Sequence, residues 1–224
     1  MVLIQITDCI ISATARTKNR PLASGKASSK GALILFAVLI TLSAVLLLFL
    51  PLVTLYWAFG AVFLATLYPF MKRWTYLPQF VLGAAFSWAI PMAFVAQGQT
   101  PSLGCWVLYV ANLCWTVAYD TQYAMTDRED DLKAGIKSTA ILFAKNDLLI
   151  IGVLQMLFLG LMATGFYILN LNIFAYVGLV IALILFVLQY LQTRDRLPEH
   201  TFKAFLNNCW VGRIVWLGVV FALF

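Results

Sequence analysis

The stretch SLGCWVLYVANLCWTVAYDTQYAMTDREDD, residues 102–131, places a long apolar run directly before a dense acidic cluster. The run from residue 102 to residue 124 can cross a bilayer, which takes roughly 20 mostly apolar residues. Five of the nine acidic residues of the chain lie between Asp120 and Asp131. Carboxylates are costly in or beside hydrocarbon, so acidic residues at the end of a membrane helix are by default a candidate functional site.

The composition of the whole chain is that of a membrane protein. Of its 224 residues, 63% are hydrophobic and 11% are charged, whereas a soluble domain is about half apolar and about a quarter charged. We therefore predict an all-α, polytopic membrane bundle of about seven transmembrane helices. The predicted spans are 31–50, 52–70, 79–97, 102–124, 141–168, 172–192 and 206–224.

Basic residues fall in alternate loops of this arrangement. They follow the second, fourth and sixth spans and fill the loop before the first, while the intervening loops hold none. By the positive-inside rule, the N-terminus and the acidic cluster face the cytoplasm and the C-terminus faces outside. The net charge of +6 is thereby explained by topology. From its composition we expect a lipid bilayer around the protein. The sequence contains no recognition helix or aromatic platform, so we expect no nucleic-acid partner.

The acidic cluster has the spacing of a metal site. Asp120, Asp127 and Asp131 would share one face of a continuous helix, where they repel one another unless a cation lies among them. Mg²⁺ is usually held by one or two carboxylates together with substrate phosphates. Asp127 and Asp131, assisted by Asp130, are the candidate ligands, and we expect Glu129 to be solvated. The alternative is that these acids only form a solvated helix end. Asp120 argues against this alternative, because it lies within the predicted span.

Basic segments beside the cluster are candidate anion sites. Arginine binds phosphate oxygens through two parallel hydrogen bonds, and lysine binds them as a point charge. Each segment is also explained by membrane topology alone, and spacing does not separate the two roles. The candidates are Arg16, Lys18, Arg20, Lys72, Arg73 and Lys137.

Three strings resemble the UbiA-type intramembrane prenyltransferases: RTKNRPLASG (16–25), YPFMKRWTYLPQFVLGAAFSWAIPMAF (68–94) and YDTQYAMTDREDDLKAGIKSTAILF (119–143). The resemblance implies nine transmembrane helices around a cavity that opens laterally to lipid, with Mg²⁺ and two aspartate-rich motifs. One metal-binding motif matches Asp127 and Asp131, with Asp120 in the adjoining segment.

The resemblance also implies an activity and a location. The branch of the family that the strings most resemble acts in ubiquinone biosynthesis at the bacterial inner membrane. It transfers a polyprenyl group from polyprenyl diphosphate to the ring of 4-hydroxybenzoate, ortho to the hydroxyl. Arg73, Asp127 and Asp131 would then be catalytic. The implied substrate-binding residues are Arg16, Lys18, Arg20, Lys72, Asp120, Tyr123 and Lys137.

The first aspartate-rich motif of the family, NDxxDxxxD, is not found where it should end, about five residues before Arg16. Its last two aspartates would fall on Thr7 and Ile11, and Asp8 is out of register. Two of the nine helices are missing as well. We therefore expect residues 1–15 to be unrelated to the family, as an altered or mis-started N-terminus would be.

On this view, residues 16–224 are an N-terminally truncated prenyltransferase domain with impaired activity. A non-catalytic remnant that at most binds prenyl diphosphate is the alternative. A transporter or channel would need polar groups near the middle of the bilayer, where only Asp120 and Arg213 are candidates.

Overall fold

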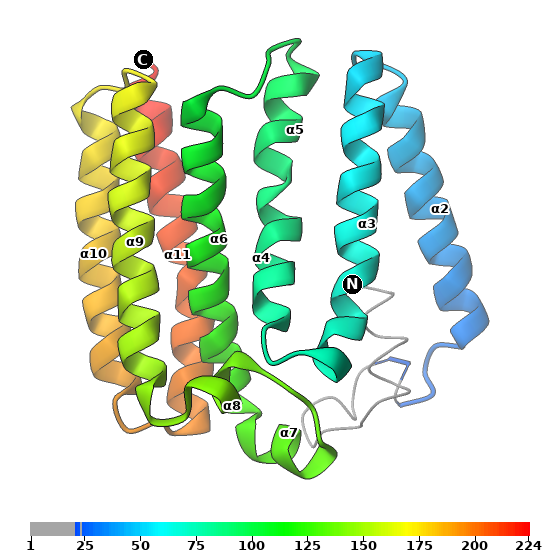
Figure 1. Cartoon of the computed structure of the whole chain (residues 1–224), viewed down its shortest axis with the longest axis vertical. Helices are drawn as coiled ribbons and strands as arrows, with labels where there is room; N and C mark the ends of the chain where they lie inside the picture. Colours follow the sequence, from blue (N-terminus) through cyan, green and yellow to red (C-terminus); the bar gives the residue numbers. More distant parts are fainter. Residues whose placement is uncertain (1–20, 23) are drawn as a thin grey trace.

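The computed structural model describes residues 21–22 and 24–224, and this part of the chain folds into helices without any strand (Figure 1). The all-α prediction is therefore confirmed. The elements are α2 (Ser29–Leu47), α3 (Leu52–Trp74), α4 (Pro78–Ser87), α5 (Ala89–Ala96), α6 (Leu103–Thr126), α7 (Arg128–Ala134), α8 (Thr139–Phe143), the 3₁₀ turn η1 (Ala144–Asn146), α9 (Asp147–Ile168), α10 (Ile173–Thr193) and α11 (Pro198–Ala222).

Six helical segments of the described chain are long and apolar enough to cross a membrane. They are α2, α3, α4 with α5, α8 with α9, α10 and α11. The remaining predicted span, 102–124, is the 24-residue helix α6, which is less apolar because it carries Asn112, Thr116, Asp120 and Gln122. The prediction of about seven membrane helices is confirmed, although α11 already begins at Pro198 and not near residue 206.

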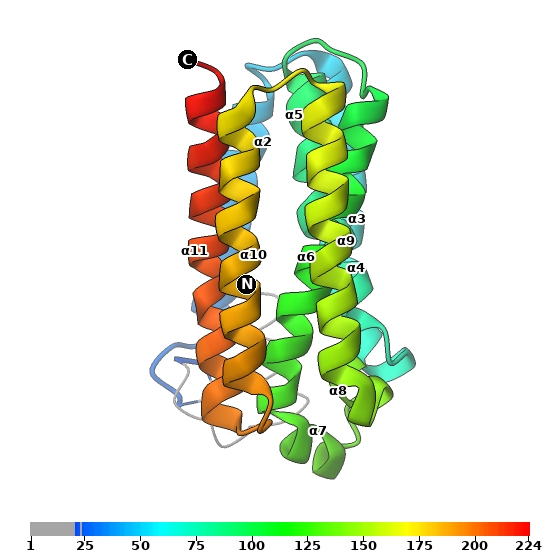
Figure 2. The ribbon, with the colours of Figure 1, turned by 90° about the vertical axis from the view of Figure 1, so that its left-hand side faces the viewer.

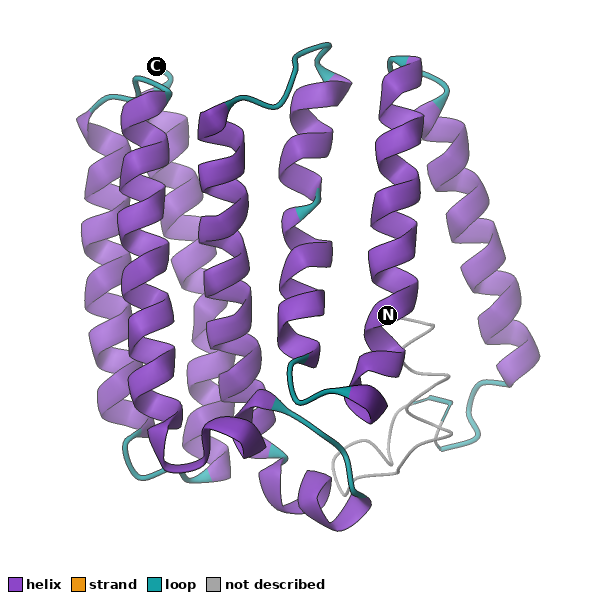
Figure 3. Ribbon diagram, in the orientation of Figure 1, coloured by secondary structure: helices purple, strands orange, loops and turns teal. Residues whose placement is uncertain are grey.

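Two of these segments are interrupted for identifiable reasons. Pro91 has no N–H and its ring crowds the carbonyl of Ser87, so the helix breaks at Trp88 between α4 and α5 (Figure 3). The segment that begins at Thr139 is broken at Ala144, whose φ of 46° is rare for a residue other than glycine. The predicted span 141–168 is therefore not one helix.

The helices pack as a four-helix bundle with a row of helices beside it. In the bundle α6 packs on α9 and α11, and α10 packs on α11 and more loosely on α9. The pair α4 and α5 packs on α6, α3 packs on that pair, and α2 lies outermost against α3 (Figure 1). Small residues allow the closest approach, since a Cβ atom added at Gly218 would lie 3.0 Å from the carbonyl oxygen of Phe174.

The charged loops gather at one end of the molecule. The α3–α4 turn, α7, α8 and the α10–α11 loop lie at the lower end in Figures 1 and 2, and the α2–α3, α5–α6 and α9–α10 loops lie at the upper end. The acidic cluster and the basic loops that follow α3, α6 and α10 are thus close to one another at a single end of the bundle.

Candidate active site

The acidic cluster lies at the junction between α6 and α7. Helix α6 ends at Thr126, Asp127 has φ −103° and ψ 8°, and α7 begins at Arg128. Three acids occupy the first turn of α7, where negative charge is favourable at a helix N-terminus. Because the helix is interrupted at Asp127, Asp120 and Asp131 do not lie on one continuous helix, as the predicted shared face required.

Asp127 and Asp131 nevertheless remain one turn apart. The N–H of Asp131 donates to the carbonyl oxygen of Asp127 at 2.8 Å. Within the described chain, no three Asp, Glu, His or Cys side chains converge on one point. A pair of carboxylates is still a suitable donor set for Mg²⁺, which takes its remaining ligands from water and phosphate. These residues therefore fit the ion, and their role as ligands stays a prediction.

The loop between α7 and α8 brings Lys137 to the end of α3. The N–H of Lys137 donates to the carbonyl oxygen of Lys72 at 3.1 Å, and its Nζ donates to the carbonyl oxygen of Trp74 at 3.3 Å. The ammonium also lies 5.4 Å from the ring centre of Tyr76, within reach of a cation–π interaction. Two basic segments that are distant in sequence thus form one positively charged surface.

Lys72 connects this positively charged surface to α6. It is half-buried in the last turn of α3, and its charge interacts with that of Asp120. Asp120 is half-buried as well, with Tyr119 and Thr121 beside it in α6. The side chain of Arg73 is exposed and has no hydrogen bond or ion pair with another described residue. The structure therefore joins the segments of Lys72 and Lys137, and Arg73 lies exposed beside Lys72 at the end of α3.

Buried hydrogen bonds hold the segment that carries Lys137. Gln79 of α4 accepts from the N–H of Thr139 at 3.1 Å, and the hydroxyls of Thr139 and Thr121 are 2.8 Å apart. All three side chains are buried. The start of α8 is thus attached to both α4 and α6, which fixes the position of the preceding loop.

An aromatic wall is formed by side chains of α6 and α11. Trp115, Tyr119 and Tyr123 are spaced four residues apart and lie on one face of α6. The ring of Tyr123 lies 4.9 Å from that of Phe205 and 6.5 Å from that of Phe202, and Tyr119 lies 6.1 Å from Phe205. The predicted site residue Tyr123 is therefore part of a larger aromatic surface.

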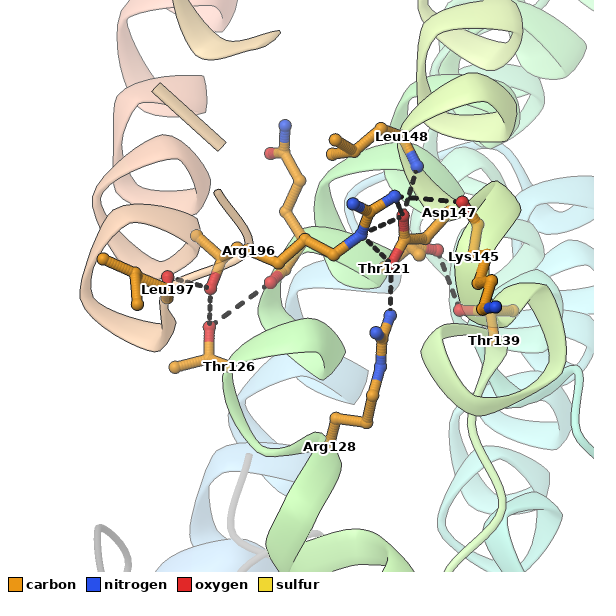
Figure 4. Close-up of polar contacts among 11 residues, drawn as sticks. Thr121, Thr126, Arg128, Thr139, Lys145, Asp147, Leu148, Arg196 and Leu197 are labelled. Atoms are coloured by element: carbon orange, nitrogen blue, oxygen red, sulfur yellow. Dashed lines mark hydrogen bonds and ion pairs between the residues drawn. The ribbon is translucent and has the colours of Figure 1, made fainter. Parts of the chain in front are cut away.

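A buried ion cluster next to the site was not predicted. Asp147, at the first position of α9, is fully buried and accepts hydrogen bonds from both Arg128 and Arg196 (Figure 4). Arg196 also donates to the carbonyl oxygen of Lys145 at 2.9 Å. Because Arg128 directly follows Asp127, this cluster fixes the α6–α7 junction relative to α9 and the α10–α11 loop.

One sequence signal could have revealed the cluster. Asp147 lies inside the predicted span 141–168, and a carboxylate there requires a partner. Its two arginines are 19 and 49 residues away, so the sequence did not identify them. Arg196 itself has a φ of 56°, a conformation that costs energy in a non-glycine residue and persists where surrounding contacts enforce it.

A network of buried amides in the middle of the four-helix bundle was also missed. The Oε1 of Gln189 accepts from Gln122 at 3.3 Å and from Gln155 at 3.1 Å. Asn208 donates to the Oε1 of Gln122 at 2.9 Å and accepts from the indole N–H of Trp115 at 2.9 Å. The network joins α6, α9, α10 and α11, and it pairs amide groups that would be costly in hydrocarbon, although the buried Nε2 of Gln189 has no partner among the described residues.

The remaining predicted residues divide into two groups. Asp127, Asp130 and Asp131 lie at the α6–α7 junction, at the same end of the bundle as Lys72 and Lys137. Arg16, Lys18 and Arg20 lie outside the described residues, so their predicted contact with substrate is not tested.

The comparison with protein families decides the identity. The model of the UbiA prenyltransferase family matches residues 5–212. This chain belongs to the UbiA prenyltransferase family. The match begins inside the segment 1–15, and the predicted domain boundary at residue 16 lies outside the described residues and stays a prediction.

Relatives of this UbiA-family protein support the same assignment. It is 56% identical to a 4-hydroxybenzoate octaprenyltransferase of Acinetobacter baylyi, covering 93% of this chain and 72% of that protein. It is 54% identical to a 4-hydroxybenzoate octaprenyltransferase of Pseudomonas syringae, covering 92% of this chain and 69% of that protein. The resemblance inferred from the three strings is therefore confirmed, and the protein is a prenyltransferase by family.

Solved structures show the same fold. The apo structure of a UbiA homologue from Aeropyrum pernix superposes with a TM-score of 0.87 at 24% identity, covering 100% of this chain and 84% of that one. A digeranylgeranylglyceryl phosphate synthase superposes with a TM-score of 0.72 at 23% identity, covering 99% and 79%. At these identities the likeness establishes the fold of this UbiA-family chain and not its substrates.

Proposed function

We propose that this chain transfers a polyprenyl group from polyprenyl diphosphate to the ring of 4-hydroxybenzoate, in a Mg²⁺-dependent reaction of ubiquinone biosynthesis. The observation that carries the proposal is the backbone hydrogen bond that joins the segments of Lys72 and Lys137, at the charged end of an apolar bundle. Such a site suits a substrate with an anionic head and a long apolar tail. The names of the relatives support the choice of 4-hydroxybenzoate.

The basic residues would bind the diphosphate. The ammonium groups of Lys72 and Lys137 are positively charged and can only donate hydrogen bonds, so they are suited to binding an anion. As the bond between the allylic carbon and the diphosphate oxygen breaks, negative charge grows on the departing oxygens. Donors that are already in position stabilise that charge without having to reorganise. Arg73, and Arg16, Lys18 and Arg20, would supply further cations.

The acidic residues would hold the metal. Asp127 and Asp131, with Asp130 beside them, offer only oxygen donors, as Mg²⁺ prefers. When bound, the ion neutralises charge on the diphosphate and so makes it a better leaving group. Asp120, two turns before Asp127, would add a further carboxylate to the substrate-binding site.

The aromatic wall would protect the carbon electrophile. Cleavage leaves positive charge on the allylic carbon, and the faces of Tyr123 and Phe205 attract cations. The ring carbon ortho to the phenolic hydroxyl forms the new bond and then loses its proton. The apolar bundle keeps out water, which would capture the cation instead.

Location and sidedness follow from the same charges. We place the protein in the bacterial inner membrane with its N-terminus and the mouth of the site in the cytoplasm, because the basic loops gather at that end. Residues 1–224 carry one of the two aspartate-rich motifs of the family, so we expect this polypeptide alone to turn over slowly. If it only binds prenyl diphosphate, binding will persist where no transfer is measured.

The test compares two lysines that differ in position. With polyprenyl diphosphate, 4-hydroxybenzoate and Mg²⁺ in vesicles, Lys137→Met should lower kcat/KM by roughly 10²–10³-fold, the cost of losing one positioned electrostatic contact. Lys133→Met is the control, because Lys133 is exposed in α7 and has no ion pair with another described residue. Equal activities of the two variants would remove Lys137 from the site. If transfer is too slow to measure, the same comparison is made on polyprenyl diphosphate binding.

A further inference from the structure

A cavity on the outer side of the four-helix bundle is lined by none of the predicted site residues that the structure describes, although its charged end adjoins the ion cluster around Asp147. It is a groove of about 1070 Å³ between α9 and α10, the pair of helices that stand apart in Figure 2. Ligand sites are usually about 300–1,000 Å³, so this groove is large enough for a lipid-sized molecule. Most of its walls are apolar side chains that are about half exposed, such as Val153, Met156 and Val187.

Glycines keep the groove open along α9. Gly152 and Gly160 both line it, and a Cβ atom added at either position would meet no atom within 4 Å. At the tightly packed α10–α11 contact, by contrast, a Cβ atom at Gly178 would lie 3.1 Å from a backbone oxygen. The glycines of the groove therefore do not serve helix packing within this chain. They leave room for a molecule that lies against the helix.

One end of the groove is positively charged. Lys145, Arg194 and Arg196 line that end, and Arg196 is engaged by Asp147. The ammonium of Lys145 and the guanidinium of Arg194 have no hydrogen bond or ion pair with any residue in the described part of the chain. Among the residues that the structure describes, no Asp or Glu lines the groove. Two unpaired cations at the mouth of an apolar groove are complementary to an anionic head group with an apolar chain.

The neighbouring acid does not neutralise this charge. Asp195 accepts from the N–H of Leu197 at 3.1 Å and lies 2.7 Å from Nδ1 of His200. These hydrogen bonds, with the backbone contact foremost, hold the pKa of Asp195 below its ordinary value. Its carboxylate is thus ionised at neutral pH and directed toward the start of α11, away from the groove.

The dimensions of the groove agree with a lipid. From Leu148 to Thr164 the lining follows α9 over sixteen helical rises, about 24 Å at 1.5 Å each. One leaflet of the hydrocarbon core is about half of 30 Å thick, so an acyl chain fits with its head group at the charged end. Tyr190, one turn before Arg194, is the kind of aromatic residue that lies at the level of head groups.

We propose that the α9–α10 groove binds an anionic phospholipid, with the phosphate at Lys145 and Arg194 and one acyl chain along Gly152 and Gly160. Basic pockets between membrane helices are suited to such head groups. Polyprenyl diphosphate fits less well, because the groove has no carboxylate for the metal ion that accompanies a diphosphate. The proposal does not depend on the reaction that the protein catalyses.

The experiment measures lipid binding by the full chain in detergent, by native mass spectrometry with phosphatidylglycerol and with phosphatidylcholine. Each cation near a membrane surface raises affinity for an anionic lipid by about fivefold. The double variant Lys145→Gln, Arg194→Gln should therefore bind phosphatidylglycerol about 30-fold more weakly and phosphatidylcholine as before. The matched control Lys133→Gln, Lys203→Gln removes two exposed charges at the same end of the molecule, outside the groove.

A second pair of variants tests the apolar part. Gly160→Leu should reduce the binding of both lipids because its side chain occupies the groove, whereas Gly160→Ala should bind nearly as the unaltered protein does. Equal affinity of the lysine–arginine double variant and its control for phosphatidylglycerol would overturn the proposal. Displacement of phosphatidylglycerol by polyprenyl diphosphate, sensitive to Lys145→Gln, would overturn it in favour of a second substrate site.

Discussion

Replacing Asp147 by asparagine should loosen the whole charged end of the bundle. Asp147 is fully buried and is the common acceptor for Arg128 and Arg196. The substitution keeps the size of the side chain and removes the charge. Two arginines then lose their counter-ion, and Arg196 loses a partner that helps to hold its φ of 56°.

The magnitude follows from the exposure of the three side chains. Breaking a fully buried ion pair costs about 3–5 kcal/mol, because a buried charge is left unpaired. Here the acid is 0% exposed, while the side chains of Arg128 and Arg196 are 24% and 40% exposed. Water can reach both arginines, so the cost must be discounted toward that of exposed pairs. We expect Asp147→Asn to lower the free energy of unfolding by about 2 kcal/mol.

The assay is reversible unfolding in mixed detergent micelles, followed by circular dichroism. Asp195→Asn is the control, since it removes an exposed carboxylate that pairs with His200, and its unfolding curve should coincide with that of the unaltered protein. Arg196→Met combined with Asp147→Asn should cost less than the sum of the single changes, because the two residues share one interaction. If the unfolding midpoint of Asp147→Asn equals that of the unaltered protein, the stabilising role of this cluster is refuted.

Three further outcomes are expected. Gln189→Leu removes the acceptor of the Gln122 and Gln155 side-chain amides. It should lower the free energy of unfolding by about 1 kcal/mol, the range of hydrogen bonds between membrane helices. An unchanged unfolding midpoint in the same assay would count against the network. Gly218→Val forces a side chain against the backbone of α10 and should cost about 1–3 kcal/mol, whereas valine at an open glycine such as Gly152 should not. Asp127→Asn should lower the rate of Mg²⁺-dependent transfer by about 10²-fold. If turnover is slow, the Mg²⁺-dependent binding of polyprenyl diphosphate is measured instead and should weaken. A normal dependence on Mg²⁺ would exclude this residue as a ligand.

Local features of the sequence were sufficient for the arrangement of the membrane helices. The apolar character of a run such as residues 173–193 does not depend on how the rest of the chain folds, so the length of the run alone predicts a membrane span. The positions of the basic loops likewise follow from composition. Within the site, Lys72 and Lys137 were recognised as candidate anion ligands, but the hydrogen bond between their segments was not predictable, because it depends on how α3 and the α7–α8 loop pack.

The sequence by itself determined the class of fold, the family and the acidic cluster at the end of α6, because hydropathy and motifs are properties of neighbouring residues. Only the tertiary structure decided that α6 ends at Thr126, that Asp147 lies between two arginines, and that α9 and α10 leave a groove. Partners such as Trp115 and Asn208 are 93 residues apart. Which polar groups meet at such distances depends on the rotation and register of packed helices, and these are set by side chains of the whole bundle together.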